Sequence, residues 1–314
     1  MKLRFYAFAT AILLYITYQY FFTPTNPVST EVITEKLNKK TLPKTLKKPK
    51  PKKSPKPKNL KKITSITKLN NSLNKNKKKS LKYLRSKNLV TFTNWKGFAV
   101  FDDDIIIGQL SDSSLKNGII EIGHSQKWES PIIGYHFHND LPKKNREEIQ
   151  KAFSYFSSRT PLRFTTAISQ GDSFLHFVPV EEERKCASFL GRQDGGQNIF
   201  LGAECDYNSV IHEVMHALGF IHEHSRFDRD QFLVINWDNV LEGKWEQFAF
   251  IPEIYILREQ LDQFDARSRM IYPPLAFSKN GQPTIESLNK NHYSGPVTDG
   301  LSDNDIERLR HYFE

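Results

Sequence analysis

Four histidines and two glutamates are concentrated in the stretch HEVMHALGFIHEHSRFDRD, residues 212–230. His212 and His216 are four residues apart, so on a helix both imidazoles lie on one face and can reach the same point. Glu213 lies between them and can address a water molecule bound at that point. Two imidazole ligands with a general base form the arrangement of a hydrolytic zinc site. Ordinary helix packing is the alternative, because two histidines and a glutamate also occur by accident.

Gly219 and His222 decide between these alternatives. Glycine permits the positive φ that ends a helix and turns the chain, which then returns His222 as a third ligand. With 15 Gly and 10 His in 314 residues, this additional pair is expected by chance roughly 0.0015 times per H-E-x-x-H segment. Three neutral imidazoles suit Zn²⁺ and leave one position open for water, as in catalytic sites. The fourth histidine, His224, is expected to have a structural role beside the metal ligands.

The elements that position these residues can be outlined from periodicity. A helix is predicted from Ser209 to Leu218, with Ser209 as the N-cap and Gly219 as its end. A second helix is predicted over residues 145–160, where Ile149, Phe153 and Phe156 fall on one inward face. A third is predicted after Ser302, where Asp305 completes a capping box. Alternating apolar residues predict a strand within residues 130–139, and further strands are predicted within residues 161–167, 172–180 and 198–202. Strands and a helix followed by an irregular half indicate an α+β fold.

The net charge of +10 is unevenly distributed. Residues 36–87 contain 21 Lys or Arg and no acidic residue, which leaves 24 basic against 35 acidic residues in the rest of the chain. The basic stretch is rich in Lys, Pro, Asn and Ser and has few large apolar residues, so residues 23–87 are predicted to form a disordered tether. A solvated spacer is the simpler interpretation, and adhesion to a membrane or another anionic surface is the alternative. We predict no specific nucleic-acid binding.

The first 22 residues carry an uncharged run, residues 5–22, behind Lys2 and Arg4. This run is marginal in length for a bilayer-spanning helix and long for the core of a signal peptide, so a membrane anchor and a cleaved signal remain open. The lysines that follow oppose simple export under the positive-inside rule, although long segments cross membranes largely regardless of charge. We expect an extracytoplasmic protein, secreted or membrane-anchored.

The chain has two cysteines, Cys186 and Cys205. An even number that closes a short loop in an exported chain predicts one disulfide, worth about 3 kcal/mol in the chain-entropy treatment. Two buried free thiols are the alternative.

The stretch from His212 to Asp230 resembles the astacin metallopeptidases, a branch of the metzincins, at every specified position of H-E-x-x-H-x-x-G-x-x-H-E-x-x-R-x-D-R-D. Glu223, after the third histidine, is the family's distinguishing residue. The stretch SRMIY is similar to the family's S-x-M-H-Y turn, which implies Met270 as the apolar floor of the metal site and Tyr272 as an oxyanion-stabilising phenol. Ile271 departs from the family's histidine, which puts the hydrogen bonding of this turn in doubt.

The resemblance also covers the loop between the cysteines, which looks like the family's short disulfide loop before the active helix. It implies a two-subdomain metzincin-type fold for residues 127–314, with a mixed sheet and an active-site helix. The family's second disulfide has no counterpart here.

Upstream, FDDDI at residues 101–105 resembles the F-x-G-D motif of astacin propeptides, whose aspartate blocks the metal. Direct mapping makes Asp104 the inhibitory ligand, with Asp102 or Asp103 as alternatives because Asp103 replaces the family's glycine. An acidic surface turn is the simpler interpretation. Residues 88–126 are accordingly predicted to be propeptide-like, and activation would need a cut between Asp104 and Trp128 by another protease, which Lys116 or Lys127 would suit.

The sequence as a whole predicts an exported zinc endopeptidase, made as a zymogen, that acts on protein or peptide substrates. Zn²⁺ would polarise the peptide carbonyl, and Glu213 would deprotonate the attacking water. A surface-binding protein that uses the basic tether, with a structural or vestigial zinc site, is the alternative from a different class. A different zinc hydrolase, such as an amidase, is a third hypothesis.

Overall fold

The structure is a computed structural model that describes residues 89–110, 117–120, 126–169, 171–288 and 294–314. The predicted anchor or signal, residues 1–22, and the predicted tether, residues 23–87, lie outside the described residues. Within the described ranges, no helix combines the length and the apolar character needed to cross a bilayer.

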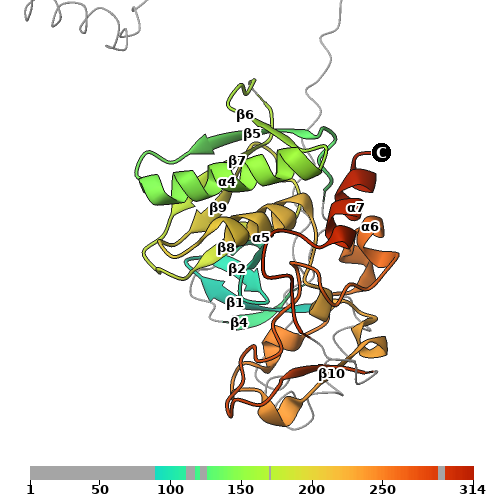
Figure 1. Ribbon diagram of the computed structural model, residues 1–314. Coiled ribbons are helices and arrows are strands. Elements are labelled where there is room, and N and C mark those ends of the chain that lie inside the picture. Colours follow the sequence, from blue (N-terminus) through green and yellow to red (C-terminus); the bar gives the residue numbers. More distant parts are fainter. Residues whose placement is uncertain (1–88, 111–116, 121–125, 170, 289–293) are drawn as a thin grey trace, which may run out of the picture. The chain divides into compact units, whose positions relative to one another are not determined.

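A mixed nine-stranded sheet forms the framework, in the order β4-β1-β2-β3-β8-β9-β7-β5-β6 (Figure 1). Three pairs of neighbouring strands in this sheet are parallel, namely β5 with β6, β5 with β7, and β7 with β9, whereas β8 and β9 are antiparallel. The strands of the sheet are β1 (Val90–Trp95), β2 (Phe98–Phe101), β3 (Ile105–Gln109), β4 (Asn117–Ile120), β5 (Ile132–Phe137), β6 (Arg163–Thr165), β7 (Phe174–Pro179), β8 (Cys186–Phe189) and β9 (Gly196–Leu201). The four predicted strand regions are confirmed as β5, β6, β7 and β9.

Two helices, α4 (Lys143–Arg159) and α5 (Tyr207–Leu218), lie side by side against one face of this sheet (Figure 1). The predicted inward face of α4 is confirmed, because Ile149, Phe153 and Phe156 are buried in the main core with residues of α5 and the parallel strands. The α+β fold with a mixed sheet is therefore confirmed.

The ends of α5 have clear local causes. Gly219 terminates the helix at φ 103°, a left-handed conformation that glycine adopts without steric cost. The predicted N-cap was wrong. The helix begins two residues before Ser209, and its N-cap is Asp206, whose carboxylate accepts a hydrogen bond from the Ser209 amide at 2.9 Å. An ionised carboxylate is a stronger acceptor than a hydroxyl at the positive end of a helix.

This cap gives a stability prediction. Asp206→Ala is expected to lower the free energy of unfolding by about 1 kcal/mol, because the amides of the first turn lose their acceptor. Ser209→Ala, which removes only a hydroxyl that donates to the same carboxylate, is the matched control and should cost less. Denaturant titration of both variants measures the difference. Equal losses would mean that the Ser209 hydroxyl contributes as much to the cap as the Asp206 carboxylate does.

After α5 the chain is mostly irregular, as predicted. It forms short 3₁₀ turns, a single-turn helix, a two-stranded ribbon and a closing helix. These elements are η1 (Glu223–Ser225), η2 (Arg229–Gln231), η3 (Trp237–Asn239), η4 (Trp245–Phe248), η5 (Glu253–Tyr255), α6 (Arg258–Leu261), β10 (Leu233–Ile235), β11 (Ile285–Ser287) and α7 (Asp303–Tyr312). The predicted capping box of Ser302 and Asp305 is confirmed at the start of α7.

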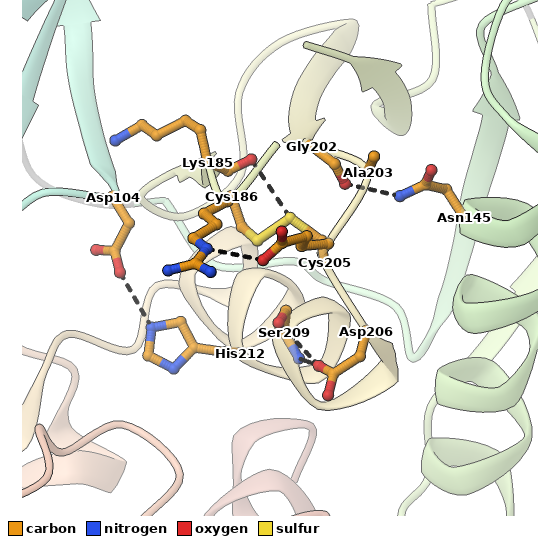
Figure 2. Close-up of a disulfide and its surroundings, with 12 residues drawn as sticks. Asp104, Asn145, Lys185, Cys186, Gly202, Ala203, Cys205, Asp206, Ser209 and His212 are labelled. Atoms are coloured by element: carbon orange, nitrogen blue, oxygen red, sulfur yellow. Dashed lines mark hydrogen bonds and ion pairs between the residues drawn. A yellow bond between two sulfur atoms is a disulfide. The ribbon is translucent and has the colours of Figure 1, made fainter. Parts of the chain in front are cut away.

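The disulfide between Cys186 and Cys205 is present and joins β8 to the residue before the N-cap of α5 (Figure 2). It closes a loop with a sequence separation of 19 residues, which corresponds to about 3 kcal/mol of unfolded-state entropy. The bond therefore ties the helix that carries His212 and His216 to the neighbouring strand.

Residues 89–110 pack as an integral part of the sheet. β3 pairs in parallel with β8, and β1, β2 and β4 extend the sheet beyond it. Phe101 and Ile105 are 1% and 0% exposed and lie in an apolar cluster with Ile221 and Trp245 from the second half of the chain. Burying one such side chain contributes about 1.5–3 kcal/mol. The structure therefore holds FDDDI firmly, although the sequence predicted no regular elements there.

Candidate metal centre

The imidazoles of His212, His216 and His222 face one another at the C-terminal half of α5. Their ring centroids are 4.6 to 5.0 Å apart, and the Nε2 atoms of His212 and His222 approach to 3.0 Å. Helical spacing places the first two, and the turn at Gly219 returns the third. The structure thus brings together the three predicted ligands.

The Asp104 carboxylate lies among these imidazoles. Its oxygens are 3.4 Å from Nε2 of His212, 3.5 Å from Nε2 of His216 and 3.4 Å from Nε2 of His222. Figure 2 shows the carboxylate directed at the His212 ring. Asp104 and the three histidines offer ligand atoms that all lie within 4.8 Å of one another. Of the three consecutive aspartates, Asp104 is thus the one whose carboxylate faces all three imidazoles.

The unsatisfied polar atoms at this point fit a metal ion. Among the described residues, Asp104 Oδ1 and His216 Nε2 are buried without a hydrogen-bond partner. Buried polar atoms without partners cost free energy, and a divalent cation would use both as ligands. Three imidazole nitrogens with one carboxylate oxygen also match the ligand types of zinc. The residues therefore fit Zn²⁺.

The other ring nitrogens fix the tautomers of two ligands. Nδ1 of His212 donates to the Arg269 carbonyl at 3.2 Å, and Nδ1 of His216 donates to the Phe220 carbonyl at 2.8 Å. Each contact leaves the Nε2 lone pair free for a metal.

Burial and the neighbouring aspartates determine the pKa values of the histidines in this site. Burial lowers the pKa of His216 to about 4. Burial alone would also lower the pKa of His222, but the carboxylates of Asp104 and Asp102 outweigh it and raise it to about 10. A bound cation would replace that proton.

Glu213 is 2% exposed, and its Oε2 atom has no hydrogen-bond partner among the described residues. Burial and the nearby Asp104 carboxylate hold the pKa of Glu213 well above its usual range. The Asp104 carboxylate therefore disfavours the ionised form of Glu213, which is the form that could accept a proton.

Tyr272 stacks on His224, with ring centroids 3.8 Å apart, and its ring is 5.0 Å from that of His222. Its hydroxyl donates to Asp102, to the backbone carbonyl at 2.9 Å and to Oδ1 at 3.1 Å. Burial, followed by the charge of Asp102, holds the pKa of Tyr272 well above its usual range. The phenol is thus neutral and held by Asp102.

Met270 is fully buried in the main core with α5, and its carbonyl accepts from the Glu223 amide at 2.6 Å. Ile271 is buried in a separate apolar cluster of the C-terminal half, where a histidine would need polar partners.

The Glu223 carboxylate is buried and accepts from four donors within the described chain: Arg308 at 2.9 Å, Gln260 at 3.0 Å, the Asp265 amide at 3.1 Å and Arg226 at 3.3 Å. The sequence offered no signal for Arg308 or Gln260, because both reach Glu223 from elements far along the chain.

Comparisons with known proteins agree with this geometry. The peptidase family described as "Astacin" matches residues 121–314. The zinc metalloproteinase nas-13 of Caenorhabditis elegans is 37% identical over 184 residues, which are 58% of this chain and 40% of that protein. The zinc metalloproteinase nas-6 of the same organism is 33% identical over 217 residues, 66% of this chain and 60% of that protein. The chain thus spans 40% and 60% of the length of these two relatives.

Among solved structures, High choriolytic enzyme 1 of Oryzias latipes, a hatching enzyme zinc-protease, is similar with a TM-score of 0.51 and 28% identity. The similarity covers 59% of this chain and 92% of that one. With the family matched over most of the described residues and the three histidines gathered around one point, the chain belongs to the astacin family of peptidases.

Proposed function

We propose that this chain is a zinc-dependent endopeptidase, made as a zymogen, that hydrolyses peptide bonds in protein or peptide substrates. The observation that carries the proposal is the convergence of Asp104 with His212, His216 and His222, whose ligand atoms lie within 4.8 Å of one another. Three imidazoles would hold the metal for catalysis, and Asp104 would occupy the position that water needs.

When bound, Zn²⁺ would lower the pKa of a water molecule toward about 7 and polarise the substrate carbonyl. Glu213 would take the proton from that water and pass it to the amine that leaves as the C–N bond breaks. Tyr272 would donate its hydroxyl hydrogen bond to the oxyanion once Asp102 no longer accepts it. Met270 would support the site from the core, and Gly219 provides the turn that returns His222.

The latent state is supported by the packing of residues 89–110. β3 covers the edge of β8, and the side chains of Phe101 and Ile105 anchor the segment on both sides of the three aspartates. Asp102 and Asp103 have positive φ values of 52° and 71°, so the turn keeps the conformation that glycine favours. Aspartate tolerates this conformation better than most residues.

The proposed activating cut lies between Asp104 and Trp128. The Trp128 amide donates to the Tyr312 hydroxyl at 2.9 Å, its indole donates to the Ala217 carbonyl at 2.8 Å, and Gln126 pairs with Arg192. These contacts hold the chain in place from Gln126 onward, so we favour a cut before Gln126. Lys116 is therefore a better candidate for the cut site than Lys127. The resemblance to the astacins implies that the new amino terminus folds inward and pairs with Glu223, and this contact would have to add to the four donors already present. Export, with secretion or membrane anchoring, also stays a proposal.

The full chain, loaded with zinc, tests the proposal. We expect little cleavage of an unfolded protein before brief trypsin treatment and strong cleavage afterwards, with trypsin inhibited before the assay. Chelation of the metal should abolish this cleavage, and added zinc should restore it. A folded, zinc-bound and trypsin-cut chain that cleaves no peptide would contradict the endopeptidase proposal. Survival of peptides with cleavage of another amide would favour a different zinc hydrolase, and polyanion binding independent of zinc would favour the surface-binding protein.

A further inference from the structure

The carboxylate of Asp102 is fully buried at the centre of a second polar cluster, next to the metal ligands rather than among them. Its Oδ2 atom is 2.8 Å from Nδ1 of His222 and 3.1 Å from Nε2 of His224. The Ser225 hydroxyl donates to the same oxygen at 2.5 Å. With Tyr272 on Oδ1, one carboxylate of the pro-segment holds four side chains of the catalytic part.

The His222 contact distinguishes this ligand from the other two. Nδ1 of His212 and Nδ1 of His216 donate to backbone carbonyls of Arg269 and Phe220, both of which follow the proposed activating cut in the chain. Nδ1 of His222 donates instead to Asp102, which leaves with the pro-segment. A carboxylate on the far nitrogen orients the ring, fixes the tautomer and strengthens the other nitrogen as a ligand.

The neighbouring histidine supports this arrangement. The Tyr272 amide donates to Nδ1 of His224 at 3.3 Å, so the hydrogen of that ring is on Nε2. The rings of His222 and His224 are stacked with an interplanar angle of 24°. Asp102 therefore accepts from Nδ1 of His222 and lies against the stacked ring of His224, whose Nε2 atom is 3.1 Å from Oδ2 but forms no hydrogen bond among the described residues.

We propose that Asp102 is a positioning residue that orients His222 for zinc, so that the pro-segment strengthens the metal site of the zymogen in addition to blocking it through Asp104. The inference rests on the proposed zinc site. Two neighbouring aspartates would then have separate tasks: Asp104 contacts the metal directly, and Asp102 acts through His222. Removal of the segment would leave a zinc site that is accessible and binds its metal more weakly.

The test measures the zinc dissociation constant of the full, uncut chain by competition with a chelator, with mass spectrometry confirming that the chain is intact. Asp102→Asn is expected to weaken zinc binding about 10- to 100-fold, the usual effect of losing such a partner. Asp103→Asn, at the adjacent exposed residue, is the matched control. Its zinc dissociation constant should stay within about twofold of the wild-type value, a far smaller change than that expected for Asp102→Asn. Asp102→Asn should raise the zinc dissociation constant by the same factor in the Asp104→Asn background as in wild type, because Asp102 does not contact the metal itself.

Ser225→Ala distinguishes a purely structural role of Asp102 from the orientation of His222. It removes another donor to Asp102 and leaves His222 in contact. This variant should lower stability without changing the zinc dissociation constant. If Asp102→Asn binds zinc as tightly as Asp103→Asn, the inference is overturned while the zinc site stands. If wild type binds no zinc, both the inference and the proposed function fail.

A second measurement avoids the variant, in case Asp102→Asn does not fold. In the imidazole ¹H–¹⁵N spectrum of the zinc-loaded wild type, the Nδ1 proton of His222 should be protected from exchange with water. It should lose that protection when the pro-segment is cut and removed, whereas the Nδ1 proton of His216 should keep it. Protection of both protons after removal would overturn the inference, because another group would then hold His222.

Discussion

Glu213→Gln is expected to reduce kcat/KM of the activated enzyme about 10²- to 10⁴-fold, the range that a positioned general base contributes. Glutamine keeps the shape of the side chain and cannot accept the proton of the attacking water. The three imidazoles are unchanged, so zinc content should stay at one per chain. Activity on a fluorogenic peptide, together with metal analysis of the same sample, measures both quantities.

Glu307→Gln on the exposed face of α7, where Glu307 pairs with Arg310, is the matched control and should retain wild-type activity. A loss of zinc in Glu213→Gln would mean that Glu213 supports the metal instead of the reaction. Activity within a few-fold of wild type would remove Glu213 from the role of general base.

Asp104→Asn is expected to raise the activity of the uncut chain about tenfold or more, because each 1.4 kcal/mol lost by the blocked state shifts the population tenfold. A neutral amide is a poor metal ligand, so water would regain the open position. The increase should remain below that of full activation, since β3 still covers β8 and Asp102 still holds Tyr272. Initial rates before and after trypsin treatment measure both states.

Asp103→Asn again serves as the control, because Asp103 is exposed and is not among the groups around the histidines. After trypsin treatment and removal of the segment, Asp104→Asn and wild type should have the same activity. An uncut Asp104→Asn chain as inactive as the uncut wild type would place the block in the packing of β3 and Phe101 rather than at the metal.

Short-range patterns predicted the parts of the site that belong to one continuous segment. The spacing of His212, His216 and His222 and the glycine that ends α5 are local features, because helical periodicity and a positive φ depend on neighbouring residues. The same holds for the buried face of α4 and the capping box at Ser302. The N-cap of α5 was misplaced because two good capping residues, Asp206 and Ser209, lie within one turn.

Long-range contacts decided the rest. The three adjacent aspartates of FDDDI are equivalent in a local pattern, so Asp102 and Asp103 remained alternatives to Asp104. In the structure, β3 pairs with β8, the Asp104 carboxylate faces the histidines, and Asp102 is directed into the interior. Three of the four donors to Glu223 likewise come from α7 and the segment around α6, and Arg226 alone is local. Such contacts depend on how distant segments pack. A local pattern can therefore name the candidate metal ligands, whereas the tertiary structure gives the surrounding carboxylates most of their partners.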